Sequence, residues 1–236
     1  MSLASILQQV ADEVGFTRPS LNAPVAADAS TQQWVALLKR AGERLYEEFA
    51  WSALITEDDV TTVAGQNDYP MPADFHRFVD DTQWNGSSRV PLFGPMSQQD
   101  WAQNQFGMIN VGPFFRQQLR GSTLFLQPTP TSAQTVSFYY VSKYWVLQGG
   151  SVPSAAFLGD SDTFQLREDL LIASLKWRWL RAKRLSYDEE RDEFDRLFIE
   201  ACAQDRGARH LSMDPWKEQD APHYGFVVPL TGFGSS

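Results

Sequence analysis

The stretch that decides the fold runs from Phe164 to Arg206 and reads FQLREDLLIASLKWRWLRAKRLSYDEERDEFDRLFIEACAQDR. Its apolar residues recur at helical spacing in two groups: Leu166, Leu170, Ala173, Trp177 and Leu180, then Phe194, Leu197, Phe198, Ala201 and Cys202. Such stripes predict two amphipathic helices. Between them, Ser186 and Glu189 have the spacing of a capping box at the start of the second helix. The stretch is therefore expected to form a helical hairpin.

The charges of this stretch fit the same hairpin. Cations gather near the end of the first helix (Lys176, Arg178, Arg181, Lys183 and Arg184) and acids at the start of the second (Asp188, Glu189, Glu190, Asp192 and Glu193). The helix dipole favours positive charge at the C-terminal end of the first helix and negative charge at the N-terminal end of the second. An antiparallel hairpin brings those two ends together. The alternative for the cations is a phosphate site for RNA. The adjacent acids oppose that alternative because they repel phosphate.

Composition narrows the class of protein. The 236 residues carry a net charge of −9, which argues against non-specific binding to DNA or to anionic membranes. Eight tryptophans and sixteen phenylalanines favour extensive contact surfaces, since large aromatic side chains are common at interfaces as well as in cores. The lone cysteine, Cys202, reads as a buried inert thiol. No apolar run reaches the roughly 20 residues of a bilayer span, and no secretory signal pattern opens the chain.

Two helices are expected before residue 52. The first carries Leu3, Ile6, Leu7, Val10 and Val14 on one face, with Gly15 placed to end it. Residues 16–29 read as a loop. The second helix begins with a capping-box spacing at Ser30 and runs to about Ala50.

A β-rich segment follows from Ser52, where the hydrophobic period changes to two. The expected strands cover 53–63, a segment from about 74 to 84, 89–93, 114–120, 123–127 and 134–146. In the last of these, Val136, Phe138 and Tyr140 face one way and Tyr139, Val141 and Lys143 the other. Gly121 and Ser122 have the composition of a two-residue hairpin turn. A short helix is expected to begin at Ser97.

The chain ends in a tail without helical or strand period. Residues 207–236 hold glycines, prolines and scattered aromatic side chains, namely Trp216, Tyr224, Phe226 and Phe233. Such a segment cannot fold alone, and its aromatic content favours ordering against a partner. The expected fold class is therefore α+β: a helical bundle built from the N- and C-terminal helices (1–51 and 151–206), an inserted β-rich module (52–150) and an extended partner-binding tail (207–236).

Candidate chemistry is sparse. The three histidines, His76, His210 and His223, have neither a cysteine nor a second histidine at metal spacing. Two carboxylate doublets, Asp58-Asp59 and Asp80-Asp81, are candidates for the pair of acids that a glycosidase needs. Neighbours on a strand point to opposite faces, so each doublet offers one carboxylate per face and reads as a solvated edge. We therefore expect no catalytic residue, no cofactor and no metal.

Seven segments together resemble the head-to-tail adaptor proteins of short-tailed phages over about residues 31–205. The segments are Glu47–Trp51, Thr61–Gln66, Tyr69–Phe75, Asp80–Trp84, Pro91–Met96, Phe138–Lys143 and Leu175–Trp179. The resemblance implies a non-enzymatic virion protein. It implies twelve copies in a ring beneath the portal, which extend the DNA channel and provide the attachment platform for the tail.

The resemblance also implies the partners and the place of action. These are the portal protein, the tail nozzle protein, further copies of the chain, and genomic DNA that passes without sequence-specific binding. The protein is expected at the head–tail junction of the virion after synthesis in the host bacterial cytoplasm, with no membrane contact. An acidic channel wall would let DNA slide, because it repels phosphate.

Two sets of residues are the candidates for these contacts. Portal or tail contacts are expected at Trp216, Tyr224, Phe226 and Phe233, and ring contacts at Arg178, Arg181, Arg184, Glu189 and Glu193. Two alternatives stay open on the residues alone. One is a cell-wall hydrolase acting during infection, and the other is a tail nozzle or gatekeeper component.

Overall fold

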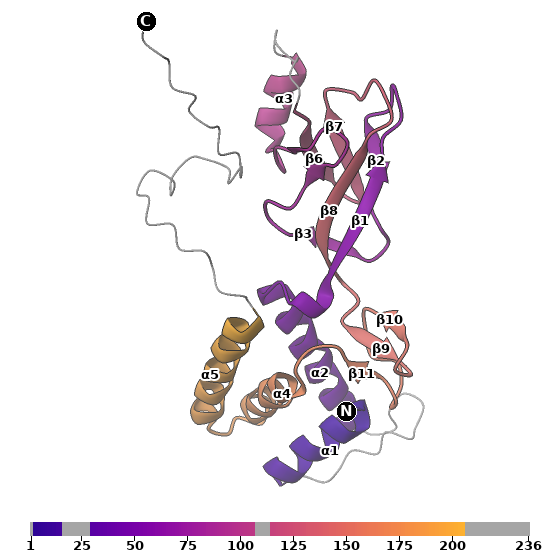
Figure 1. Ribbon diagram of the computed structural model, residues 1–236. Helices are drawn as coiled ribbons and strands as arrows, with labels where there is room; N and C mark the ends of the chain where they lie inside the picture. Colours follow the sequence, from indigo (N-terminus) through magenta and orange to yellow (C-terminus); the bar gives the residue numbers. More distant parts are fainter. Residues whose placement is uncertain (1, 16–28, 107–113, 206–236) are drawn as a thin grey trace, which may run out of the picture.

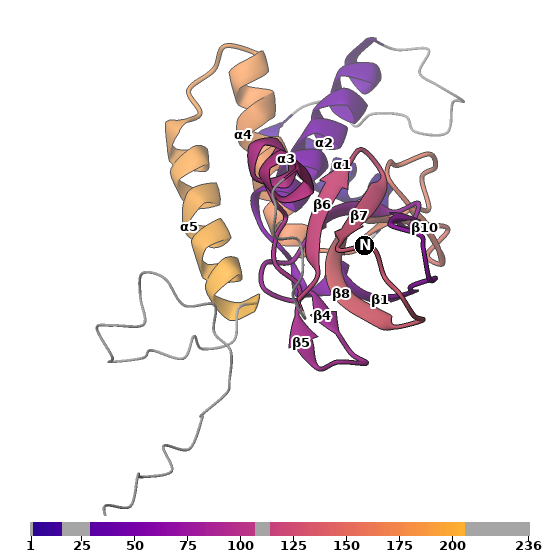
Figure 2. The same cartoon turned by 90° about the horizontal axis from the view of Figure 1, so that it is seen from above.

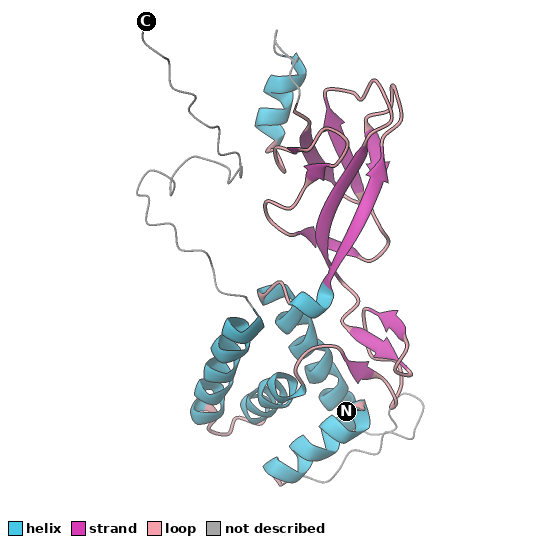
Figure 3. Ribbon diagram, in the orientation of Figure 1, coloured by secondary structure: helices cyan, strands magenta, loops and turns pink. Residues whose placement is uncertain are grey.

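The protein is elongated, with helices gathered at one end and most strands at the other (Figure 1). The structure, a computed structural model, describes residues 2–15, 29–106 and 114–205. In those residues it contains five α-helices and three antiparallel sheets, so the predicted mixture of α and β is confirmed. Figure 3 shows that α1, α2, α4 and α5 make up the helical end and that α3 lies at the far tip of the β end.

The helices are close to their predicted positions. Their bounds are Leu3–Val14 (α1), Ala29–Glu48 (α2), Gln98–Phe106 (α3), Glu168–Ala182 (α4) and Asp188–Asp205 (α5), with a 3-10 turn at Ser52–Leu54. Gly15 ends α1 in the left-handed conformation, at φ 75°, as predicted. Helix α2 begins at Ala29, so Ser30 lies inside the helix and not at its cap. Helix α4 begins at Glu168, four residues later than predicted.

The helical end has its own hydrophobic core. Helix α4 contacts α1, α2 and α5, and Figure 2 shows α4 lying between α2 and α5. The indole ring of Trp34, on α2, stacks on that of Trp179, on α4. Trp145 contributes to the same core and packs directly on Gly42 of α2, where an added Cβ would lie 2.3 Å from the ring. Residues distant in the sequence therefore share one core.

The strands form three sheets. Their bounds are Ile55–Thr61 (β1), Asp68–Pro70 (β2), Phe75–Phe78 (β3), Trp84–Asn85 (β4), Val90–Pro91 (β5), Arg116–Arg120 (β6), Thr123–Gln127 (β7), Thr135–Ser142 (β8), Val146–Gln148 (β9), Val152–Ser154 (β10) and Thr163–Phe164 (β11). The largest sheet has the order β1-β8-β4-β5, with β3 also paired to β8. The two smaller sheets have the orders β10-β9-β11 and β2-β7-β6.

Strand β8 supplies both hydrophobic cores. Val136, Phe138 and Tyr140 lie in the core of the β end, and Val141 lies in the core of the helical end. The prediction that the first three face one way is confirmed. The single long strand predicted for 134–146 is instead two strands, because the ladder breaks after Ser142 and resumes at Val146 in a different sheet.

Two local predictions at the β end are confirmed. Strands β6 and β7 form a hairpin in which Arg120 pairs with Thr123, and Gly121 takes φ 61° in the turn between them. At the start of α3, the Ser97 hydroxyl accepts a hydrogen bond from the Asp100 amide at 3.1 Å. That hydroxyl also donates to the Asp100 carboxylate at 2.7 Å, which completes the expected cap.

Two segments differ from prediction because of long-range pairing. Residues 52–54, expected at the start of a strand, form the 3-10 turn before β1. Phe164, expected in the first helix of the hairpin, pairs with Val146 as part of β11. Phe164 lies outside the apolar stripe that begins at Leu166, and its strand conformation depends on the distant partner Val146.

Candidate assembly surfaces

The connection between α4 and α5 presents a cation in an unusual backbone conformation. Arg184 has φ 60°, and the Leu185 amide donates to the Leu180 carbonyl at 3.0 Å while the Arg184 amide donates to the Arg181 carbonyl at 3.1 Å. This pair of bonds defines a Schellman cap, a position that favours glycine. Helix α5 then begins at Asp188, where the Tyr187 carbonyl accepts from the Arg191 amide at 3.0 Å. Tyr187, and not the predicted Ser186, therefore holds the cap position of α5.

A basic patch forms where α4 meets α2, and we call it the arginine cluster: Arg40, Arg44, Arg178 and Arg181. Its centre is Arg178, a half-buried side chain whose guanidinium lies over the Trp177 ring at 4.5 Å. Burial lowers the pKa of Arg178, and repulsion by Arg40, Arg44 and Arg181 adds to that effect. The carboxylate of Glu48 acts in the opposite direction and accepts from Arg44 Nε at 2.6 Å. The cluster thus holds more positive than negative charge.

An acidic groove of about 600 Å³ lies on the other side of α4. Its lining residues are Lys176, Glu189, Glu190, Glu193, Arg196, Leu197 and Glu200, and we call this set the acidic groove. Lys176 also lies 3.8 Å from the Glu13 carboxylate of α1. The groove is therefore bounded by α5 and by the side of α4 that faces α1.

The predicted ring-contact residues divide between these two surfaces. Arg178 and Arg181 belong to the arginine cluster, Glu189 and Glu193 line the acidic groove, and Arg184 lies in the turn between the helices. In the described residues no salt bridge joins the cations of α4 to the acids at the start of α5. Salt bridges between these charges are thus not what joins the two helices. Their contacts include Trp177 with Phe194 at 6.4 Å between ring centroids, and at the start of α4 the Arg167 guanidinium donates to the Gln204 side-chain oxygen at 2.8 Å.

Sequence reasoning missed Arg40 and Arg44, because they lie on α2 far from the hairpin in sequence. The available signal was their spacing, since Arg40, Arg44 and Glu48 recur every four residues and share one helix face. Sequence reasoning also left Glu200 out of the set of acids. That residue stands seven positions after Glu193 and therefore lies on the same face of α5.

The carboxylate doublets do not form a paired site. On β1, Asp58 is half-buried and Asp59 is exposed, as expected for neighbours on one strand. Asp80 and Asp81 are both exposed and follow β3, with Asp81 at φ 59°. The buried carboxylate of this structure is instead Asp162, which accepts hydrogen bonds from the amides of Gly149, Leu158 and Gly159 and so orders the loop around β10.

His76 belongs to a strand. It lies half-buried on β3, and its ring meets the edge of Tyr46, on α2, at 5.1 Å between centroids. Burial lowers its pKa, and Arg77 adds to that effect while Glu47 opposes it. Its Nδ1 atom is buried without a hydrogen-bond partner. The residue therefore belongs to the contact between the helical end and the β end.

Within residues 2–15, 29–106 and 114–205, no group of three or more metal-ligating side chains occurs. None of the helices in this part of the chain combines the length and the apolar character needed to cross a membrane. Cys202 is half-buried and packs against the helical core. His210, His223 and the predicted contact residues Trp216, Tyr224, Phe226 and Phe233 lie outside the described residues.

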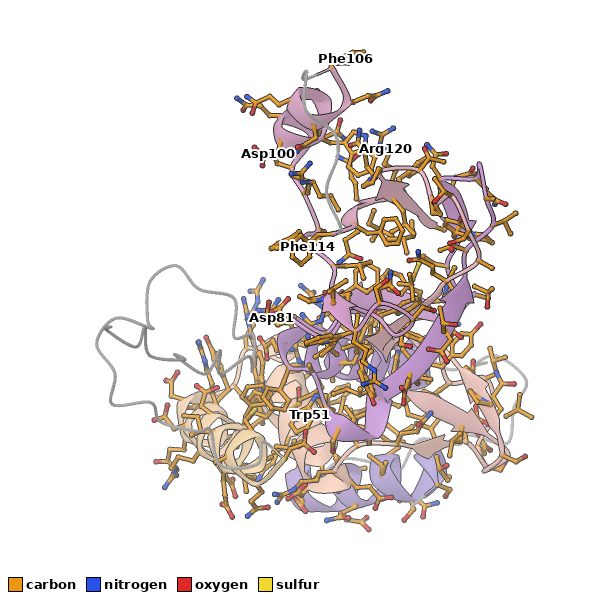
Figure 4. The ribbon with its side chains drawn as sticks, turned by 45° about the horizontal axis from the view of Figure 1, so that its top comes forward. Trp51, Asp81, Asp100, Phe106, Phe114 and Arg120 are labelled. Atoms are coloured by element: carbon orange, nitrogen blue, oxygen red, sulfur yellow. The ribbon has the colours of Figure 1, made fainter. Side chains whose placement is uncertain are left out.

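The tip of the β end exposes aromatic side chains. Phe106, at the end of α3, is 82% exposed, and Phe114 is 40% exposed while it packs edge-on against Phe93. Figure 4 shows Phe106 at the extremity of the molecule and Phe114 projecting from the side of the β end. Helix α3 is attached to the sheet through Arg120, whose guanidinium lies over the rings of Trp101 and Phe125. Aromatic side chains exposed in this way are typical of contact surfaces.

Comparison with known proteins places the chain in a family. No curated protein matches the sequence significantly. The family described as "SU10 adaptor protein" matches residues 1–219, which include both helical segments, the β end and the start of the tail. The match supports the resemblance to phage head-to-tail adaptors and the assignment of a structural protein of the virion. The chain therefore belongs to the SU10 adaptor protein family, a family of structural phage adaptors.

Proposed function

We propose that the protein is the head-to-tail adaptor of a phage virion and acts by assembly. In this role a ring of copies, twelve in number, lies beneath the portal, extends the DNA channel and gives the tail its platform. The observation that carries the proposal is the family match over residues 1–219. An elongated subunit with contact surfaces at both ends suits this role, because each copy must meet neighbours above, below and beside it.

We propose different contacts for the two ends of the subunit, each of which has its own hydrophobic core. We assign ring formation to the helices of segments 1–51 and 151–206, where the arginine cluster and the acidic groove lie. We assign support of neighbouring copies or contact with the tail nozzle to segment 52–150, whose tip exposes Phe106 and Phe114. The ring contacts then include Arg178, Arg181, Arg184, Glu189 and Glu193.

The remaining assignments concern the tail and the DNA. We assign portal contact to residues 207–236 through Trp216, Tyr224, Phe226 and Phe233, because aromatic side chains supply large contact area when a segment orders on a partner. Genomic DNA passes the ring without specific binding, in keeping with the net charge of −9. The proposed role needs no catalytic residue and no cofactor.

The test is a portal-binding experiment with purified full-length protein and the portal of the same phage. Truncation after Arg206 is expected to leave a folded subunit, judged by circular dichroism, that no longer joins the portal in co-sedimentation and electron microscopy. A second variant keeps the chain length and changes Trp216, Tyr224, Phe226 and Phe233 to Ala. Normal joining by both variants would contradict the role of the tail. A wild-type protein that binds the tail nozzle but not the portal would contradict the adaptor role itself.

A further inference from the structure

The arginine cluster carries charge that its own subunit leaves uncompensated. Three guanidinium groups, those of Arg40, Arg44 and Arg181, act on that of Arg178, and the one carboxylate that acts on its pKa, Glu48, is already engaged by Arg44 at 2.6 Å. The other contacts of Arg178 are a hydroxyl and a ring: its Nε donates to Ser174 Oγ at 3.2 Å, and the Trp177 ring lies beneath it. Arginine forks arranged in this way suit carboxylates, which they bind through two parallel hydrogen bonds.

The acidic groove has an excess of negative charge. Four glutamates line it, against two cations. Lys176 is already engaged by Glu13 of α1 at 3.8 Å, and Arg196 Nε donates to the Asp192 carbonyl at 3.3 Å. Both cations therefore have contacts of their own outside the set of glutamates. Glu200 accepts a hydrogen bond from Gln204 at 3.0 Å, and the four carboxylates still outnumber the two cations beside them.

The two surfaces lie on opposite sides of α4. Lys176 and Arg178 are two residues apart on α4, so their side chains leave the helix about 200° apart. Lys176 faces α1 and the acidic groove, whereas Arg178 faces α2 and the arginine cluster. A subunit that carries two complementary patches can pair head to tail with identical copies, and such contacts close into a ring.

We propose that the arginine cluster of one copy receives the acidic groove of the next copy, and that this charge pairing is the lateral contact of the assembly. The inference rests on the proposed function and names the surfaces by which its ring forms. A second copy fits better than nucleic acid, because the chain itself supplies matching carboxylates in the groove. The carboxylates of the neighbour would also relieve the repulsion among the four arginines.

The experiment reverses charges at one exposed residue of each surface. Arg181→Glu changes the cluster, Glu193→Arg changes the groove, and both positions are exposed, so each variant is expected to fold. Assembly of full-length protein is scored on the phage portal by electron microscopy and, without the portal, by native mass spectrometry of the concentrated protein. Each single variant is expected to lose the complete ring. The double variant is expected to regain it, because the reversed charges again face each other.

Matched controls make the same charge changes away from these surfaces. Arg89→Glu and Asp80→Arg alter exposed side chains of the β end and are expected to assemble as the wild type does. Complete rings formed by either single variant, or failure of the folded double variant to recover, would overturn the inference. Loss of DNA retention by Arg181→Glu with normal rings would also overturn it and assign the cluster to phosphate.

Failure of the adaptor role and failure of the lateral contact give different experimental results. If the wild type does not bind the portal, the proposed function fails, and the charge swap is then decided by native mass spectrometry alone. If the wild type binds the portal and the charge swap has no effect, the adaptor role stands and the lateral contact lies elsewhere.

Discussion

The indole rings of Trp34 and Trp179 lie parallel within 11°, with their centroids 3.7 Å apart. One ring comes from α2 and the other from α4, so this contact joins the N-terminal helices to the C-terminal hairpin. Lys183 extends the stack, with its ammonium group 4.4 Å from the Trp179 ring and 2.9 Å from the Gln33 side-chain oxygen. The stack therefore anchors two segments that lie far apart in the sequence.

Removal of one ring of this stack is expected to destabilise the subunit severely. Trp34 is 1% exposed, and Trp34→Ala should lower the free energy of unfolding by about 3–5 kcal/mol, because it leaves a cavity and removes the ring contact. Chemical denaturation followed by fluorescence measures the loss. Val35→Ala, at the neighbouring exposed position, is the control and should cost about 0.5 kcal/mol or less. Equal effects of the two substitutions would show that the stack does not anchor the helices.

Gly42→Ala is expected to destabilise the protein although alanine is the better helix former. The added methyl group would lie 2.3 Å from the Trp145 ring inside a packed core. Overpacking of this kind costs about 1–3 kcal/mol, which outweighs a gain of about 1 kcal/mol in helix propensity.

The second variant in this test is Gly42→Ala combined with Trp145→Phe, whose smaller ring leaves room for the methyl group. The double variant should lose less stability than the sum of the two single losses, as measured in a double-mutant cycle by thermal unfolding. Strict additivity would mean that Gly42 and Trp145 do not interact.

Arg184→Gly is expected to stabilise the protein. Arg184 takes φ 60° at the end of α4, a conformation that strains a residue with a side chain and suits glycine. The gain should be about 1 kcal/mol, because relief of strain is partly offset by the greater freedom of glycine in the unfolded chain. Denaturant melts of the purified variant measure it.

Arg184→Ala separates the backbone from the charge. It removes the same guanidinium but keeps the strained conformation, so it should show no comparable gain in stability. A similar increase in both variants would indicate relief of charge repulsion and would refute the backbone explanation.

His76 is expected to make stability fall as the solution is acidified. Burial lowers its pKa in the folded state below the ordinary value of about 6.5. Above pH 6.5 the ring is neutral in both states, so its contribution is fully retained. As the pH falls below 6.5 the unfolded chain takes up the proton first, and stability is lost until the folded-state pKa is passed.

The measurement is the melting temperature as a function of pH for wild type and His76→Phe. The variant cannot titrate at this position and should show a smaller loss between pH 7 and pH 5. Arg77 and Glu47 also act on this ring, so Arg77→Ala should weaken the pH dependence of the wild type, because it removes a group that lowers the pKa of His76. Identical profiles for wild type and His76→Phe would contradict the assignment.

Features set by neighbouring residues were predictable from the sequence. The β6–β7 hairpin depends on Gly121 at its turn, the cap of α3 on Ser97 and Asp100, and the end of α1 on Gly15, all within a few residues of the structure that they determine. The role of Glu189 and Glu193 as ring contacts stays a prediction, and both residues line the acidic groove.

Features that depend on distant partners were not predictable from local pattern. Phe164 leaves the expected helix because Val146 offers it a strand partner. Arg40 and Arg44 join Arg178 only because α2 packs on α4, and no spacing within a single segment encodes that contact. In the described residues the cations of α4 form no salt bridge with the acids at the start of α5, for a related reason. Neighbouring positions on α4 point in different directions, and Arg178 is turned toward α2.

The alternation along β8 couples the two ends of the molecule during unfolding. Phe138 is anchored in one core and Val141 in the other, three positions apart on the same strand. If either end unfolds, the core of the other end loses its contacts with β8. Unfolding of one core therefore destabilises the other. In the proposed role, force applied by a partner at one end would reach the other end through the continuous backbone of β8. The subunit would then respond as one rigid body.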